Sequence, residues 1–274
     1  MPVKSYRADY LREAVGSLLA QTSPHWRALI IHARGARVAI EADLGEALAD
    51  PRIELVEERG RKLAGALNTG MFEARTEFTA ILLADDLWEV DAIEVLERNI
   101  ARHPEVDFFH SSLRMIDDGG APISGVVPAR PDVSAAAFRQ WARVRHLLCW
   151  RRELALDIGG MDESLNSVGP DDFDFPWSMA DAGATFRAIA DCLYVYRDHR
   201  SCYRLTTHLP RRTHVRETQR ILRKHGVPEA DIRRRIAHAR RTHLRQCLYS
   251  SALEAWLKRV LRDDPAGGWR QSYR

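Results

Sequence analysis

The stretch Phe78–Asp86, FTAILLADD, determines how the rest of this 274-residue chain is interpreted. Its apolar and β-compatible residues indicate a buried strand, and two adjacent aspartates end it. In open α/β sheets, ligands bind beyond the carboxyl ends of the strands, so Asp85 and Asp86 indicate a functional site. Adjacent carboxylates repel each other unless a cation lies between them, and a divalent metal with oxygen ligands meets that need. A solvated acidic turn before the next helix is the alternative interpretation of the same pair.

Length and charge bound the class of protein. With 274 residues and 45% hydrophobic content, the chain suits one large domain with an appendage. The net charge of +3 implies no global electrostatic partner, but it is unevenly distributed. From Pro210 onward there are 17 Lys/Arg against 6 Asp/Glu, whereas the preceding residues hold 24 against 32. We therefore expect a domain at residues 1–209 and a basic helical extension at 210–274, which either packs on the acidic domain or contacts an anionic membrane.

The cysteine pattern and the hydropathy predict the compartment. Four cysteines without CxxC or zinc-ligand spacing indicate buried thiols of a reducing compartment. No stretch approaches the roughly 18 apolar residues of a membrane helix, and no signal-peptide core is present at the N-terminus. We expect a cytoplasmic protein, with peripheral membrane contact through the basic extension as a further hypothesis. Nucleic acid is not an expected partner, because no recognition motif accompanies the basic residues.

Strand-like and helix-like segments alternate along the first half of the chain, and the second half is less regular. The predicted helices are 8–20, 63–74, 91–103, 135–145 and 177–182, and the predicted strands are 26–31, 53–56, 77–83, 106–110, 185–189 and 193–196. This βαβ alternation predicts an α/β fold with a mainly parallel, Rossmann-like sheet covered by helices on both faces.

Eight short motifs follow one another between Pro2 and Ser201. They are PVKS at 2–5, YLREAVGSLLAQT at 10–22, ALNTG at 66–70, LADD at 83–86, IDDGG at 116–120, GGMDE at 159–163, DDFD at 171–174 and YRDHRS at 196–201. In this order and spacing they resemble the family 2 glycosyltransferases, which have the GT-A fold, over about three quarters of the chain. Each motif alone is weak, and the resemblance depends on their order.

The resemblance implies a site in which a sugar is transferred from a nucleotide diphosphate. The implied donor is a UDP-sugar, the implied metal is Mn²⁺ or Mg²⁺, and the acceptor is a glycan, a lipid-linked molecule or a small molecule. The residues implied to bind the nucleotide sugar are Pro2, Val3, Lys62, Ala84 and Asp85. The implied metal ligands are Asp85, Asp86 and His199. Asp172 is the candidate catalytic base, with Asp171 as the reserve.

The chemistry explains why carboxylates are needed at such a site. Negative charge develops on the leaving diphosphate, and a divalent metal stabilises it as a Lewis acid. The acceptor hydroxyl must lose its proton as it attacks, which requires a positioned carboxylate base. Attack opposite the leaving group in a single displacement inverts the anomeric configuration. For Asp171–Asp174 the alternative is an acidic cluster that complements a helix dipole.

Several weaker candidates keep a structural alternative. Arg61 and Lys62 precede a predicted helix and either meet phosphates or are simply solvated. His199 is either a metal ligand or a structural histidine. The tryptophans at 88, 150 and 177 either line a sugar subsite or belong to the core.

The sequence departs from the family pattern in three places. Only Met1 precedes Pro2, so we expect a short first strand. Residues 31–35, IHARG, lack the carboxylate that follows the family's second strand, and Leu83 replaces the first Asp of its D-x-D motif. These departures motivate an alternative, in which the chain is a weakened or inactive relative that binds a nucleotide or a partner. A nucleotidyltransferase is the third hypothesis. It is disfavoured because that class normally has a glycine-rich, basic loop directly after the first strand, and residues 3–7 contain no glycine.

Overall fold

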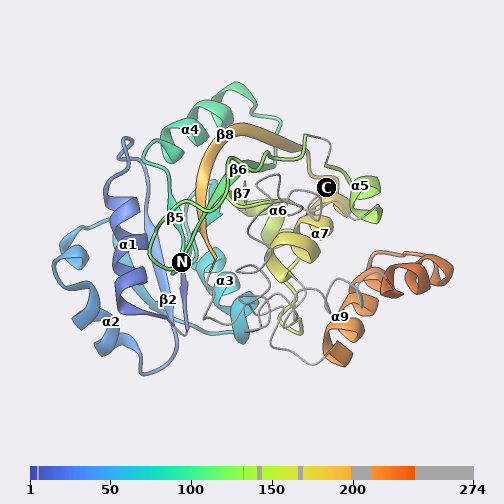
Figure 1. Cartoon of the computed structure of the whole chain (residues 1–274), viewed down its shortest axis with the longest axis horizontal. Coiled ribbons are helices and arrows are strands. Elements are labelled where there is room, and N and C mark those ends of the chain that lie inside the picture. Colours follow the sequence, from blue (N-terminus) through green and yellow to red (C-terminus); the bar gives the residue numbers. More distant parts are fainter. Residues whose placement is uncertain (5, 132, 141–143, 166–168, 199–210, 238–274) are drawn as a thin grey trace, which may run out of the picture. The chain divides into compact units, whose positions relative to one another are not determined.

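The computed structural model describes residues 1–4, 6–131, 133–140, 144–165, 169–198 and 211–237 (Figure 1). The chain divides into two compact units, Met1–His199 and Arg200–Arg274. The domain boundary that the charge distribution predicts, after residue 209, lies outside the described residues.

Three parallel strands form the first sheet, in the order β1–β2–β3. Their bounds are β1 Pro2–Val3, β2 Ala28–His32 and β3 Ile53–Glu57. The helices that accompany them are α1 Ala8–Leu19, α2 Arg37–Leu44 and α3 Lys62–Glu73, with a short 3₁₀ helix at Gly45–Ala49. The α2 helix is absent from the sequence prediction because it buries only Ile40 and Leu44, too few apolar positions to establish a period.

The second sheet has five strands in the order β4–β7–β6–β8–β5. Their bounds are β4 Phe78–Ile81, β5 Leu87–Trp88, β6 Phe108–Ile116, β7 Leu148–Arg151 and β8 Phe186–Arg197. The β6–β8 pair is parallel, whereas β4–β7, β6–β7 and β5–β8 are antiparallel. The predicted α/β architecture is thus confirmed, with a second sheet of mixed direction. Short apolar runs indicate that strands are buried but carry no information on their direction.

Helices cover this second sheet as well. They are α4 Ala92–Arg102, α5 Ala135–Arg139, α6 Arg152–Asp157 and α7 Phe175–Asp181, and a π-helical turn, η2 Pro170–Asp174, leads into α7. Figure 1 shows α6 and α7 beside β7, and α4 along the outer side of β8. The helix predicted to reach residue 145 ends at Arg139, and the two predicted strand pieces after residue 184 form the single strand β8.

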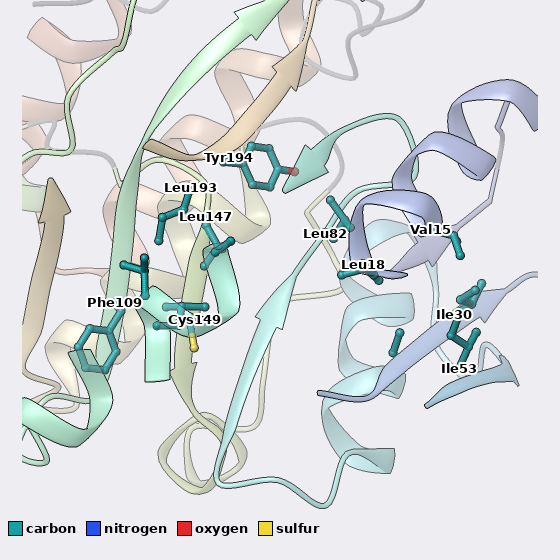
Figure 2. Packing of buried hydrophobic residues seen from close by; sticks show 14 of the residues in the cluster. Val15, Leu18, Ile30, Ile53, Leu82, Phe109, Leu147, Cys149, Leu193 and Tyr194 are labelled. Carbon is teal, nitrogen blue, oxygen red and sulfur yellow. The ribbon is translucent and has the colours of Figure 1, made fainter. Parts of the chain in front are cut away.

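A continuous apolar core joins the two sheets (Figure 2). Val15 and Leu18 of α1 pack in it with Ile30 of β2, and Leu82 and Tyr194 belong to the same cluster. Leu82 follows β4 and Tyr194 lies on β8, so the core holds the end of β4 against β8. This packing fixes the position of the two aspartates that follow β4.

An aromatic cluster accounts for two of the tryptophans. Trp150 is 2% exposed and stacks on Phe108, with ring centroids 6.1 Å apart. Trp177 is fully buried and stacks on Phe138 at 6.0 Å. The core interpretation therefore holds for both. Trp88 is half-buried and packs against the main core.

In the second unit, the described residues form α9 Arg211–Lys224 and a helical segment at 229–237. A non-helical stretch at residues 225–228 separates them. Ile221 and Leu222 of α9 are buried, whereas Arg212, Arg216 and Arg223 are exposed. Among the described residues, no helix is both long enough and apolar enough to cross a membrane.

Candidate active site

The turn after β4 places one aspartate inside the protein and leaves its neighbour partly accessible. Asp86 is 1% exposed, and Asp85 is half-buried. The backbone N–H of Arg197 donates to Oδ1 of Asp86 at 2.7 Å, and the hydroxyl of Tyr194 donates to Oδ2 at 2.7 Å. The backbone N–H of Leu83 donates to the same hydroxyl at 3.4 Å. Both carboxylate oxygens of Asp86 therefore hold the turn to β8.

A buried arginine supports the other side of this turn. Arg197 is 1% exposed, and its Nε donates to the backbone oxygen of Asp85 at 2.9 Å. Its guanidinium lies 4.3 Å from the ring centroid of Tyr10, donates to the backbone oxygen of Asp118 at 3.4 Å and pairs with Glu13. These residues come from the YLREA, IDDGG and YR motifs. Three separate motifs thus converge on the LADD turn.

The electrostatics of Asp86 follow from its surroundings. Burial and the neighbouring charge of Asp85 raise the pKa of Asp86 to about 7, although hydrogen bonds from Arg197 and Tyr194 favour the ionised form. Burial, together with the nearby Asp86, also raises the pKa of Tyr194 well above its usual value, so the phenol stays protonated and remains a donor.

The second acidic turn is η2, which begins after Gly169. Asp171 is 7% exposed, and its Oδ2 lies 3.1 Å from Nε2 of the buried His146. Asp172 is half-buried. Gly169 adopts a φ of +30°, and a Cβ at this position would come within 1.8 Å of Oδ1 of Asp172. Only glycine leaves room for this placement of Asp172.

His146 and Asp171 form a buried ion pair. Burial alone would lower the pKa of His146, but the hydrogen bond and charge of Asp171, with the charges of Asp172 and Asp86, raise it. Burial likewise opposes ionisation of Asp171, and the hydrogen bond and charge of His146 outweigh it and lower that pKa. The His146 ring also packs on Tyr194, with ring centroids 5.1 Å apart. The contacts Asp86–Tyr194–His146–Asp171 therefore link the two acidic turns.

The loop before α3 is held by the GGMDE motif. The side chain of Glu163 accepts from the backbone N–H of Arg61 at 2.9 Å and from Nδ2 of Asn68 at 3.2 Å. Lys62 donates through Nζ to the backbone oxygen of Ser164 at 3.1 Å. Nearby lies a cavity of about 170 Å³; its lining residues are Arg59, Gly60, Gly65, Asn68, Thr69, Phe72 and Glu163. The ALNTG and GGMDE motifs thus meet to shape this loop.

The other residues implied by the resemblance lie as follows. Pro2 and Val3 form β1, pair with Ile31 and His32, and are buried. The α3 helix, which begins at Lys62, contacts β1, β2 and η2. Ala84 is half-buried against the core beside Asp85. His199 lies outside the described residues.

The carboxylates near the turn after β4 are the candidate ligands for a divalent metal. Among the described residues, no group of three or more His, Cys, Asp or Glu side chains is arranged to hold a metal ion. Mg²⁺ usually takes only one or two protein carboxylates and completes its shell with water and substrate phosphates. The half-buried carboxylate of Asp85 at the end of β4 fits that requirement, while Asp86 is engaged by Tyr194 and Arg197.

Sequence reasoning missed His146 and Tyr194. Both lie in apolar segments, where a polar side chain that needs a buried partner is the only available signal. Arg197 lies within a motif, but its role under the Asp85 turn depends on the contact of β8 with the turn after β4, which no local pattern predicts.

Comparison with known proteins is consistent with this geometry. Residues 1–125 match the model of "Glycosyl transferase family 2". O-antigen biosynthesis protein RfbC of Myxococcus xanthus is 25% identical over 202 residues, which cover 72% of this chain and 15% of that protein. The chain therefore spans only a small part of that relative.

Solved structures show the same fold. S. aureus TarS 1–349 in complex with UDP-GlcNAc has a TM-score of 0.63 and 14% identity, covering 97% of this chain and 76% of that one. The same protein in complex with UDP has a TM-score of 0.60 and 14% identity, and the match covers 92% of this chain and 72% of that one. The GT-A fold and the family resemblance seen in the sequence are confirmed.

Proposed function

Taking the match of residues 1–125 to glycosyl transferase family 2 as the premise, we propose that this protein transfers a sugar from a UDP-sugar to an acceptor hydroxyl. The observation that carries the proposal is the meeting of two acidic turns, at Asp85–Asp86 and Asp171–Asp172, from distant parts of the sequence. The structurally similar TarS, which was solved in complex with UDP-GlcNAc and with UDP, supports a uridine diphosphate donor.

Asp85 is the residue that would hold Mn²⁺ or Mg²⁺ together with the donor phosphates. Such an ion, when bound, neutralises the charge that develops on the leaving diphosphate. Pro2 and Val3 at the end of β1, Lys62 at the start of α3 and Ala84 are the proposed contacts to the nucleotide sugar. A cationic Lys62 beside a helix N-terminus favours an anionic ligand.

Asp172 is the proposed general base, and Asp171 the reserve. The acceptor oxygen forms a bond to the anomeric carbon as the bond from that carbon to the diphosphate oxygen breaks. The hydroxyl proton passes to Asp172, and UDP leaves with the bonding electron pair. This single displacement inverts the anomeric configuration. The assignment is supported by burial, because Asp171 is committed to His146 whereas Asp172 is more exposed.

A donor screen tests the activity. The full chain, with a panel of UDP-sugars and Mn²⁺, should release UDP only when a suitable acceptor is present, and EDTA should suppress the release. Thermal shifts measured in parallel should show metal-dependent binding of one donor. Metal-dependent binding without any release across a broad acceptor panel would favour the alternative, an inactive nucleotide-binding relative. Neither binding nor release would refute the proposed function.

The proposed acceptor is a glycan, free or linked to a lipid. The support comes from the relative named O-antigen biosynthesis protein RfbC. Oligosaccharides with and without a lipid anchor, offered at equal concentration, distinguish these acceptors. If only small non-carbohydrate alcohols were glycosylated, this acceptor class would be wrong.

A second contact is proposed for α9, whose exposed residues Arg212, Arg216 and Arg223 face solvent opposite a buried apolar side. Spaced four and seven residues apart, they lie on one face of the helix and form a basic stripe, which favours an anionic lipid surface. The full chain should float with vesicles containing phosphatidylglycerol and not with pure phosphatidylcholine.

The double substitution Arg212→Gln/Arg216→Gln should weaken this flotation, and raised salt should weaken it further. The matched control, Arg98→Gln/Arg102→Gln, removes two exposed arginines from α4 and should float like the wild type. Equal flotation of both double variants would remove α9 as the membrane contact.

A further inference from the structure

We propose that His146 is a positioning residue for glycosyl transfer, which holds the η2 turn so that Asp172 faces the acceptor. This inference rests on the proposed function for its catalytic consequence. The underlying contact between His146 and the turn is a property of the fold and is testable without any turnover.

The first step is the geometry around His146. The residue precedes β7, is 9% exposed, and points Nε2 at Oδ2 of Asp171 over 3.1 Å. Asp171 is itself buried, so each partner satisfies a polar group that would otherwise be costly to bury. The pair is a side-chain hydrogen bond that joins the segment before β7 to η2.

The second step concerns the turn itself. A π-helical turn is rare, and such turns occur often at functional sites. Asp172 follows Asp171 directly within this turn, so a shift of the Asp171 side chain also shifts the carboxylate of Asp172. On the other side, Gly169 lies so close to Asp172 that a Cβ at this position would collide with its side chain. Asp172 is thus fixed between a close glycine and a neighbour anchored by His146.

The third step is the charge distribution. His146 is surrounded by Asp171, Asp172 and Asp86, which together favour its protonated form. On its other side the imidazole packs on Tyr194, and Tyr194 donates to Asp86. The imidazole therefore lies between the turn that carries the proposed base and the turn that carries the proposed metal ligand. When protonated, it offsets the negative charge of the two turns.

A second buried histidine shows that this arrangement is not general in the fold. His110 on β6 is fully buried, and within the described part of the chain neither ring nitrogen has a hydrogen-bond partner. Burial and the charge of Arg145 lower the pKa of His110 to about 4, so it stays neutral. His110 therefore supplies a matched control: a buried imidazole in the same unit with no bond to an acidic turn.

The test uses the full chain and two substitutions of His146. His146→Phe keeps a ring against Tyr194 and removes the donor to Asp171, whereas His146→Gln keeps a donor without the charge. His110→Phe is the control. Backbone hydrogen exchange over residues 169–174 measures how firmly the turn is held, and turnover and donor affinity are measured on the same samples.

The inference predicts that His146→Phe accelerates exchange at 169–174 by at least tenfold, while His110→Phe leaves it unchanged. Turnover should fall about tenfold to a hundredfold in His146→Phe, the range typical of a small misplacement, with donor affinity within twofold of wild type. His146→Gln should recover part of both properties.

Wild-type exchange at 169–174 in both His146 variants would overturn the inference, and so would a parallel loss of donor affinity and turnover. If the wild type shows no turnover with any donor, the proposed function fails, and the exchange data still decide whether His146 holds the turn. Should His146→Phe not fold, His146→Gln alone carries the exchange comparison.

Discussion

The two acidic turns of this protein have the same composition and opposite electrostatics. Each contains adjacent aspartates of which one is buried, Asp86 after β4 and Asp171 in η2, and one is half-buried, Asp85 and Asp172. Asp86 is held by a neutral phenol and a backbone N–H, and its pKa is raised to about 7 by burial and by Asp85. Asp171 is held by a cationic imidazole, which lowers its pKa.

The difference shows that burial alone does not determine the charge of a carboxylate. Both side chains are desolvated, and the nature of the partner decides which form is favoured. In each turn the buried aspartate anchors the backbone, and its neighbour is more accessible to a ligand. The predictions below separate the aspartates that anchor the backbone from those proposed to contact the metal or the acceptor.

The largest effect is expected at Asp85. Asp85→Ala should abolish the metal-dependent part of UDP-sugar binding, because it removes the accessible carboxylate that we propose as metal ligand. Calorimetric titration of the UDP-sugar with and without Mn²⁺ measures this metal-dependent part of the affinity. Asp91→Ala, which removes another aspartate at the start of α4, is the control and should bind normally. Unchanged Mn²⁺-dependent affinity in Asp85→Ala would exclude this residue from the site.

The next effect is expected at Asp172. Asp172→Asn keeps the shape of the side chain but cannot accept a proton, so turnover should fall by about 10²–10⁴, the usual contribution of a general base. Donor affinity should stay near wild type. Asp171→Asn should reduce turnover less, through loss of its bond to His146. If Asp171→Asn lost more turnover than Asp172→Asn, the two roles would have to be exchanged.

A smaller loss of turnover is expected from Gly169→Ala. The added methyl group collides with Asp172 and should reduce turnover by roughly tenfold to a hundredfold, since small misplacements of reacting groups have that cost. Gly183→Ala is a matched control, because Gly183 also has a positive φ (+92°) but no atom lies within 4 Å of its added Cβ. Both variants should lose stability through backbone strain, and only Gly169→Ala should lose activity. Equal turnover in the two would mean that Asp172 is not confined by Gly169.

Tyr194 offers a test of the anchor at Asp86. Tyr194→Phe removes the donor to a buried carboxylate and should lower the free energy of unfolding by about 1–3 kcal/mol. Tyr6→Phe removes a similar bond, at 2.8 Å, to the half-buried Asp43, where water replaces it, and should cost less. Denaturant unfolding of both variants provides the comparison. An equal loss of unfolding free energy in the two variants would show that the burial of Asp86 does not strengthen the contribution of its hydrogen bond from Tyr194.

The smallest effect is a pH dependence of stability. Because the pKa of His146 is raised above 6.5, its ion pair stabilises fully below pH 6.5 and is lost as the pH rises through the raised value. The pKa of the partner, Asp171, is lowered below 3.8. The ion pair is therefore also lost in strong acid, where Asp171 becomes protonated. Asp86 and Asp172 face the same imidazole and favour its proton.

The difference in unfolding free energy between wild type and Asp171→Asn should therefore shrink between pH 6 and pH 9. A pKa difference of one corresponds to about 1.4 kcal/mol. Asp50→Asn is the control, because its half-buried partner Arg52 does not titrate in this range. A constant difference for Asp171→Asn would contradict a charged His146.

Local patterns predicted much of the fold. The helices at 8–20, 63–74 and 91–103 are confirmed as α1, α3 and α4. Apolar residues on one face are buried in α1 and α4, whereas α3 is buried over Ala64–Thr69 and at Met71. The mixed direction of the second sheet was not predicted, because short apolar runs such as Leu148–Arg151 are compatible with either direction. The strand β8 was predicted as two pieces, whereas in the structure the interruption is a register shift within one strand.

By itself, the sequence determined an α/β chain with aspartates at the end of a buried strand and in a turn after a glycine, because periodicity and residue type are local properties. The GT-A type was implied by the resemblance of its ordered motifs to a known family. Only the tertiary structure decided which aspartate of each pair is an anchor. That choice depends on Tyr194, Arg197 and His146, which approach the turns from distant strands and set the burial and charge that the local sequence leaves open.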